Sequence, residues 1–134
     1  MNYKYGVYGM DLIDVYLSNL HKINEMTLDD YANKSKVQKN NKLAKDNRQI
    51  ASDIERVYPE YKEEFAKLLL DENWKIRCQV AHHMLEVMNY PKEYRKMALN
   101  EIKSVIDKNI LVESLGNKMW LKEWYELHPQ DELL

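Results

Sequence analysis

The chain has 134 residues, a length typical of one ordinary domain. Hydrophobic residues make up 45% and charged residues 31%, and with only three Gly and three Pro this composition favours helices over strands. The net charge of −2 is too small to indicate a class of partner, and a single cysteine, Cys78, excludes an internal disulfide. The first residues lack a signal-peptide pattern, and no apolar run approaches the roughly 18 residues that span a bilayer. We therefore expect a cytoplasmic protein that does not associate with membranes.

Two helices are predicted after a ragged lead-in of ten residues, and they form a leading pair over residues 11–58. The first, over about 11–24, has apolar residues at helical spacing: Ile13, Tyr16, Leu17, Leu20 and Ile23. Thr27, with Asp30 three residues later, predicts the N-cap of the second helix. That helix runs to about Val57, and we expect it to thin or kink near residues 40–41 because Asn is a poor helix former. Its second half carries an apolar stripe: Leu43, Ile50, Ile54 and Val57.

Two further helices begin at a proline and at an aspartate. Pro59 fits the first turn of a third helix, where a missing N–H costs nothing. The buried face of that helix is predicted to be Phe65, Leu68 and Leu69. Asp71 is expected to cap a fourth helix that runs to about Met88.

The last part of the chain predicts two more helical stretches and a tail. Pro91 opens a fifth helix with an inward face of Tyr94, Met97, Ala98, Ile102, Val105 and Ile106. A sixth stretch begins at Asp107 or Asn109, bends near residues 116–117 and ends before Pro129. The acidic residues beyond Pro129 are expected to fray.

A spaced pattern repeats within the second half of the chain. Four residues recur 36 residues later in equivalent places: Asp71, Asn73, Ile76 and Leu85 match Asp107, Asn109, Val112 and Leu121. A fixed period in this range indicates stacked helical repeats. Arg77 lies in the middle of the apolar face of the fourth helix, so it must pair with an acid, and Asp71 or Asp107 is expected to supply it.

The residues Asp71, Arg77, Val80, Ala81 and Leu85 resemble the second helix of a HEAT-like repeat. The resemblance implies a ladder between repeats through Asp71, Arg77 and Asp107. It also implies an all-α fold of about six helices in antiparallel pairs, arranged as a right-handed alpha-alpha superhelix. The second copy departs from the pattern, with Glu113 in place of the Arg, and with Gly116 and Asn117 in place of Val80 and Ala81. We therefore expect one domain over residues 1–134, with two HEAT-like units over 59–127, the second a degenerate cap, and a tail over 128–134.

The resemblance also bears on function. The chain is similar to a small bacterial family with toxin-immunity-like members, which implies a protein that binds a cognate toxin and occludes it. In HEAT-like stacks the second helices line a concave surface, so the outer face of the fourth helix is the expected partner-binding strip: Lys75, Gln79, His82 and Glu86. A small structural adaptor is a further alternative, and the sequence identifies neither the partner nor the oligomeric state.

The sequence contains little that indicates an enzymatic or a metal-binding function. Cys78, His82 and Glu86 are spaced like zinc ligands on one helix face, but zinc normally needs four ligands and no second cluster is present. His82 and His83 diverge by about 100° and cannot act on one atom. We expect no enzyme, no metal and no cofactor.

Nucleic-acid binding is the leading alternative. The second helix carries a basic run that could contact phosphates, and we assign this role to Lys39, Lys42, Lys45 and Arg48. Steps of three residues spread these side chains over about half of the helix circumference, which is more typical of a solvated helix. Trp120 and Trp124, one turn apart, are interpreted as the stripe that closes the last helix pair, or as part of an interface.

Overall fold

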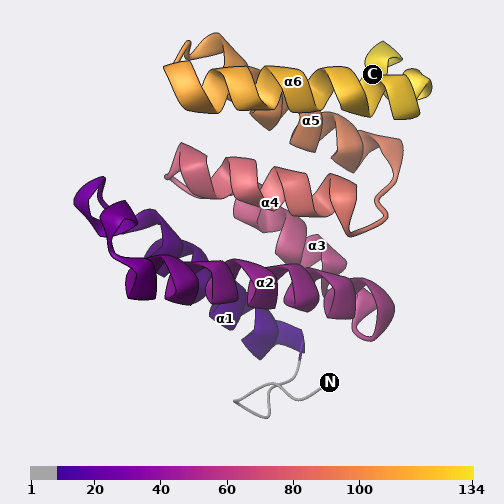
Figure 1. Cartoon of the computed structure of the whole chain (residues 1–134). Coiled ribbons are helices and arrows are strands. Elements are labelled where there is room, and N and C mark those ends of the chain that lie inside the picture. Colours follow the sequence, from indigo (N-terminus) through magenta and orange to yellow (C-terminus); the bar gives the residue numbers. More distant parts are fainter. Residues whose placement is uncertain (1–8) are drawn as a thin grey trace. The chain divides into compact units, whose positions relative to one another are not determined.

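The computed structural model describes residues 9–134, with side chains from Asp11 onward (Figure 1). These residues form six α-helices and four short 3₁₀ helices and contain no strand, as the composition predicts. Most of the expected lead-in lies outside the described residues. The chain divides into two compact units, one ending at Lys67 and the other running over Leu68–Leu134. No helix in the described part of the chain is both long and apolar enough to cross a bilayer.

The first unit is built on an antiparallel helix pair, α1 (Gly9–Asn24) and α2 (Lys34–Arg56) (Figure 1). The prediction that the second helix begins at Thr27 is wrong. Thr27 and Asp30 bond reciprocally, and they begin only the short 3₁₀ helix η1 (Asp29–Ala32). The chain is extended at Asn33, whose side chain accepts a hydrogen bond from the backbone N–H of Lys36 and caps α2. The unit continues with three short segments: η2 (Pro59–Tyr61), α3 (Lys62–Ala66) and η3 (Lys67–Leu70), the last of which crosses into the second unit.

The core of the first unit lies at one end of the helix pair. Its largest fully buried side chains are Leu12, Tyr16, Leu20, Ile50, Ile54 and Phe65. All fully buried residues of α2 lie in its second half, from Asn47 onward. The helix is continuous through residues 40–41, contrary to the expected kink, and Val57 is exposed because the helix has already ended at Arg56. Burial therefore anchors only the second half of α2.

The second unit consists of α4 (Trp74–Glu86), α5 (Lys92–Asp107), α6 (Leu111–Leu127) and the 3₁₀ helix η4 (Pro129–Leu133). Helix α5 packs against both α4 and α6, and η4 folds back onto α5 and α6. The expected bend in α6 near residues 116–117 is absent. The prediction that the chain frays beyond Pro129 is also wrong, because η4 is helical and buries Asp131.

The starts of α4 and α6 differ although the sequence pattern repeats. Asn73, and not Asp71 as predicted, caps α4 by accepting a hydrogen bond from the N–H of Lys75. Asp71 instead accepts from the N–H of Asn73 and fixes the preceding turn. In the second copy Asn109 has a positive φ of 56°, and α6 has no side-chain cap at its first position. The repeated residues therefore have different structural roles in the two copies: Asn73 caps a helix, whereas Asn109 adopts a left-handed backbone conformation before the next helix. Of the inward face expected of α5, Ala98, Ile102 and Val105 are buried, Tyr94 and Ile106 are half-buried, and Met97 is exposed. Leu99, which was not expected there, is buried.

Candidate functional site

The strip predicted on α4 is largely occupied by contacts within the second unit. One ring nitrogen of His82, Nδ1, lies 2.9 Å from Glu86 Oε2, and the other, Nε2, lies 2.7 Å from Asn117 Oδ1 on α6. The Nδ2 group of Asn117 donates to the Glu113 carbonyl, which fixes the amide with its oxygen toward His82. Trp120 packs edge-on against the same imidazole at 4.5 Å. Helix α6 therefore covers the middle of the strip.

This environment favours the charged form of His82. Burial lowers the pKa of this imidazole, but hydrogen bonds with Cys78, Glu86 and Asn117 outweigh it and raise the pKa to about 10. Both ring nitrogens face acceptors, so both donate, and neither is free to act as a base. Cys78 itself is buried, with its sulfur 3.6 Å from Asn117 Oδ1. The cluster is suited to holding α4 and α6 together.

The two remaining members of the strip differ in exposure. Lys75 is exposed, with its ammonium group 5.7 Å from the centre of the Trp74 ring. Gln79 is half-buried and has a partner of its own. Only Lys75 is therefore fully available on the amino-terminal half of the strip.

Arg77 is half-buried and paired, as expected, but not with the predicted carboxylates. Its Nε lies 3.1 Å from Glu101 Oε2 on α5, and its Nη1 donates to the backbone carbonyls of Asp71 at 2.7 Å and Glu72 at 3.1 Å. Asp71 contributes only its main chain because its carboxylate bonds the turn, and Asp107 is exposed at the end of α5. The proposed ladder of Asp71, Arg77 and Asp107 is thus replaced by a link from the turn before α4 to α5.

Arg95 has the same linking role as Arg77, although this was not predicted from the sequence. Arg95 on α5 donates from Nε and Nη2 to Asp131 Oδ1 at 3.1 and 3.0 Å, and from Nη1 to the Tyr90 carbonyl. Asp131 is almost fully buried and also accepts from Trp124 Nε1 at 3.1 Å. Trp124 in turn stacks on Trp120 and on His128. Trp124 thus joins α6 to η4, as expected of a residue that closes the last helices, whereas Trp120 packs against His82 on α4.

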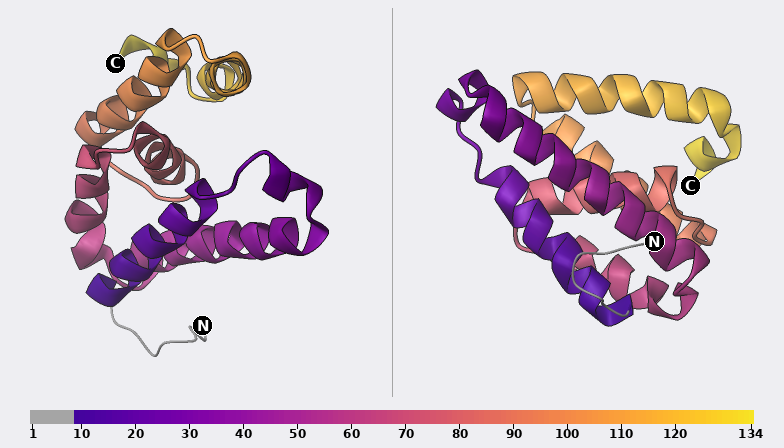
Figure 2. Two further views of the ribbon diagram at one scale, coloured as in Figure 1. Left: turned by 90° about the vertical axis from the view of Figure 1, so that its left-hand side faces the viewer. Right: turned by 60° about the horizontal axis from the view of Figure 1, so that its bottom comes forward.

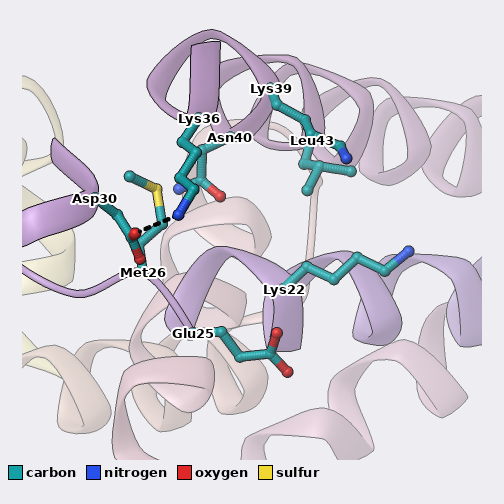
Figure 3. A pocket seen from close by; sticks show the side chains of 8 residues that line it. All are labelled: Lys22, Glu25, Met26, Asp30, Lys36, Lys39, Asn40 and Leu43. Atoms are coloured by element: carbon teal, nitrogen blue, oxygen red, sulfur yellow. Dashed lines mark hydrogen bonds and ion pairs between the residues drawn. The ribbon is translucent and has the colours of Figure 1, made fainter. Parts of the chain in front are cut away.

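The first unit contains an open pocket of about 300 Å³ at the end of the helix pair that its core does not fill (Figure 3). The left-hand view of Figure 2 shows α1 and α2 diverging toward this end, which η1 bridges. The lining comes from α1, η1, α2 and the turn between α1 and η1: Lys22, Glu25, Met26, Asp30, Lys36, Lys39, Asn40 and Leu43. In Figure 3, Leu43 and Asn40 project from α2 toward α1. The pocket therefore combines apolar side chains with a charged rim.

The lysines of the rim are not equivalent. Lys36 lies 2.8 Å from Asp30, as the dashed line in Figure 3 shows. This contact and the N–H of Thr27 lower the pKa of Asp30 to about 2, so that pair stays charged. Lys22 and Lys39, by contrast, have no acidic partner among the described residues. Two uncompensated cations therefore stand at this pocket.

The residues assigned to nucleic-acid binding are spread over the same helix. Lys39 lines the pocket, Lys42 pairs with Asp46 at 3.2 Å, and Lys45 and Arg48 are exposed outside the pocket lining. Residues 21–48 contain seven Lys or Arg and four Asp or Glu, a net charge of +3 in a chain of net charge −2. Basic character is thus concentrated in this part of the first unit.

The outward face of α6 is apolar and uncovered by the described residues. Its exposed side chains are Leu111, Val112, Leu115 and Met119, with exposed fractions from 57% to 83%. A Cβ atom built on Gly116 would meet no heavy atom within 4 Å. Ser114 is the only buried residue of this helix.

The described residues contain no group of three or more His, Cys, Asp or Glu side chains that could hold a metal ion. No protein family, no curated protein and no solved structure matches this chain.

Proposed function

We propose that this chain is a non-enzymatic protein-binding module whose partner is a bacterial toxin, and that binding occludes the toxin. The observation that carries the proposal is the pocket between α1, η1 and α2, which combines apolar side chains with the uncompensated cations Lys22 and Lys39. Interfaces in general pair an apolar centre with a charged rim, and rim charges mainly set association rate and specificity. Lys22 lies on α1, and Lys39 and Leu43 lie on α2; side chains held on regular helices lower the ordering cost of binding.

Several contacts support a binding role over a catalytic one. His82 donates from both ring nitrogens, and Cys78 is buried beside it. The resemblance of residues 71–85 to a HEAT-like repeat supports the toxin-immunity form of the proposal. It also supports a right-handed superhelical arrangement of the helices and a location of the protein in the cytoplasm. The strip of Lys75, Gln79, His82 and Glu86 is the second candidate surface, with Lys75 its most available member.

The test is a complex with the protein encoded by the neighbouring gene. Isothermal titration of the two purified proteins is expected to give a 1:1 complex with a Kd below about 1 μM, and the activity of the neighbour is expected to be lost in the complex. The single variants Lys39→Glu and Lys75→Glu then compare the two candidate surfaces. A neighbour that shows no binding and no change of activity would contradict the toxin-immunity proposal.

The alternative is nucleic-acid binding by α2, and the net charge of +3 over residues 21–48 favours it. Such binding must weaken steeply with salt, because neutralised phosphates release counterions. We expect fluorescence anisotropy to detect no sub-micromolar complex with single- or double-stranded DNA at physiological salt. A tight, strongly salt-dependent complex would favour nucleic-acid binding over binding to a protein partner.

A further inference from the structure

We propose that the pocket between α1, η1 and α2 receives an acidic segment of the partner protein, with one apolar side chain inserted between the helices and carboxylates placed at Lys22 and Lys39. The inference rests on the proposed protein-binding function and adds the site and the chemistry of the partner.

The helix pair has an end that its own core does not fill. Every fully buried residue of α2 lies from Asn47 onward, whereas Leu43 is only half-buried and lines the pocket. Met26, which follows α1, lines the pocket as well and is also half-buried. Two apolar side chains therefore face a space of about 300 Å³, which is large enough for a Leu or Phe side chain of a partner. Covering them would remove apolar surface from water.

The charges of the rim select an acidic ligand. Lys36 is held by Asp30, so the cations free to bind are Lys22 and Lys39. In Figure 3 the side chains of Lys22 and Lys39 extend toward the same end of the gap between the helices. Glu25 also lines the pocket, but it is exposed, and the surrounding segment 21–48 has a net charge of +3. A segment with two or more carboxylates is therefore attracted, while Glu25 reduces the attraction.

The lining distinguishes a protein segment from a nucleic acid. Single-stranded nucleic acids are held by aromatic side chains on which bases stack, together with a groove of cations that follows the phosphates. The lining of this pocket contains no aromatic side chain and places two carboxylates, Glu25 and Asp30, among its cations. An apolar floor with an incomplete ring of positive charge fits an acidic polypeptide better.

The experiment selects ligands without assuming a sequence. A phage-displayed library of random twelve-residue peptides is panned on the intact chain and counter-selected on the double variant Lys22→Glu/Lys39→Glu. The expected peptides contain Asp or Glu around at least one large apolar residue. They are expected to bind the double variant at least tenfold more weakly than the unmodified chain, and to shift the amide NMR signals of Met26, Asn40 and Leu43.

Matched variants test the role of each charge. Lys45→Glu makes the same charge change on the same helix outside the pocket lining, so it should weaken the selected peptides less than twofold. Glu25→Gln removes the opposing charge and should strengthen them by about twofold to threefold. Serine in place of the apolar residue of the peptide should abolish the shifts at Leu43. Circular dichroism of each variant should match that of the unmodified chain, because the altered side chains are exposed.

Three results of the peptide and DNA measurements would overturn the inference. One is a selected set that is basic or lacks apolar residues. Another is equal weakening by Lys45→Glu and by Lys39→Glu, which would indicate a diffuse charge effect. The third is a twenty-nucleotide single-stranded DNA that binds more tightly than the peptides and shifts the same signals. If the neighbouring protein binds with unchanged affinity to the double variant, the inference fails while the proposed function stands. If peptides bind as expected and the neighbour does not, the pocket stands and the toxin-immunity proposal fails.

Discussion

Different polar groups connect α1 to α2 in the first unit and α5 to α4 and η4 in the second. In the first unit, neutral amides link α1 to α2: Asn19 Nδ2 donates to Asn47 Oδ1 at 3.0 Å, and Asn47 Nδ2 donates to the Tyr16 carbonyl at 3.1 Å. In the second unit two of the links are made by the guanidinium groups of Arg77 and Arg95. Each arginine binds a backbone carbonyl of the turn before its helix and a carboxylate of another element.

The difference follows from burial. Asn47 is 1% exposed, and a full charge at that position would lose its hydration entirely, whereas an amide needs only its hydrogen bonds. The side chain of Arg77 is 24% exposed, so its charge keeps part of its hydration. Its guanidinium group at the same time donates hydrogen bonds to the backbone carbonyls of the turn before α4. The two links should therefore respond differently to mutation, pH and salt.

The largest effect is expected from Asn47→Ala. The change removes the acceptor of the buried Asn19 amide and one of the donors to the Tyr16 carbonyl in a nearly dry environment, and we expect a loss of about 3 kcal/mol in the free energy of unfolding. Urea denaturation measures the loss. Asn41→Ala, at an exposed position of the same helix, gains the same helix propensity and should change stability by less than about 0.5 kcal/mol. A loss below about 1 kcal/mol for Asn47→Ala would show that the buried amide link is unimportant.

The charged link should be weaker. Arg77→Ala strands Glu101 and the carbonyls of Asp71 and Glu72, but water reaches these groups, so we expect a loss of about 2 kcal/mol. Asp107→Ala is the matched control and should have almost no effect. Equal losses for Asp107→Ala and Glu101→Gln would restore the ladder predicted from the sequence.

The pairing of His82 predicts a stability that depends on pH. The pKa of His82 is raised from 6.5 to about 10 in the folded state, so its contribution is complete below pH 6.5 and is lost as pH rises toward 10. Allowing for its partial exposure, we expect the free energy of unfolding to fall by about 1.5 kcal/mol between pH 6.5 and 9 through this group. The His82→Gln variant should lose this slope, and the difference between the two denaturation curves isolates the group. Parallel curves would mean that His82 is neutral in the folded chain.

Local patterns in the sequence were informative where one helix decides the outcome. The spacing of Ile13, Tyr16 and Leu20 located α1 and its buried face, since helical periodicity alone determines which residues share a side. The start of α2 was missed because Thr27 and Asn33 are both good caps, and only the extended backbone at Asn33 distinguishes them.

Contacts between elements were harder to predict. The apolar helix face around Arg77 implies that this residue needs an acid, and the sequence favours Asp71 or Asp107. The packing of α4 against α5 instead selects Glu101. Likewise, the residue spacing of α4 does not indicate that Asn117 covers His82. The residue spacing of α5 does not indicate that Asp131 is buried against Arg95. These pairs are separated by 24 to 36 residues, and their identity depends on how helices pack. The pocket of the first unit was missed for the same reason, because the divergence of α1 and α2 has no signature in either helix alone.

The smallest effect is expected on the outward face of α6, where the helix packs against nothing among the described residues. A Cβ at Gly116 would meet no atom within 4 Å, so Gly116→Ala gains helix propensity without a clash and should stabilise the chain by about 0.7 kcal/mol. The adjacent change Asn117→Ala should do the opposite, because Asn117 holds His82 and the Glu113 carbonyl. Chemical denaturation of both variants measures the contrast. If Gly116→Ala instead weakens the complex with the neighbouring protein while stabilising the free chain, the partner approaches α6 closely, and the interface lies on the second unit instead of the pocket of the first.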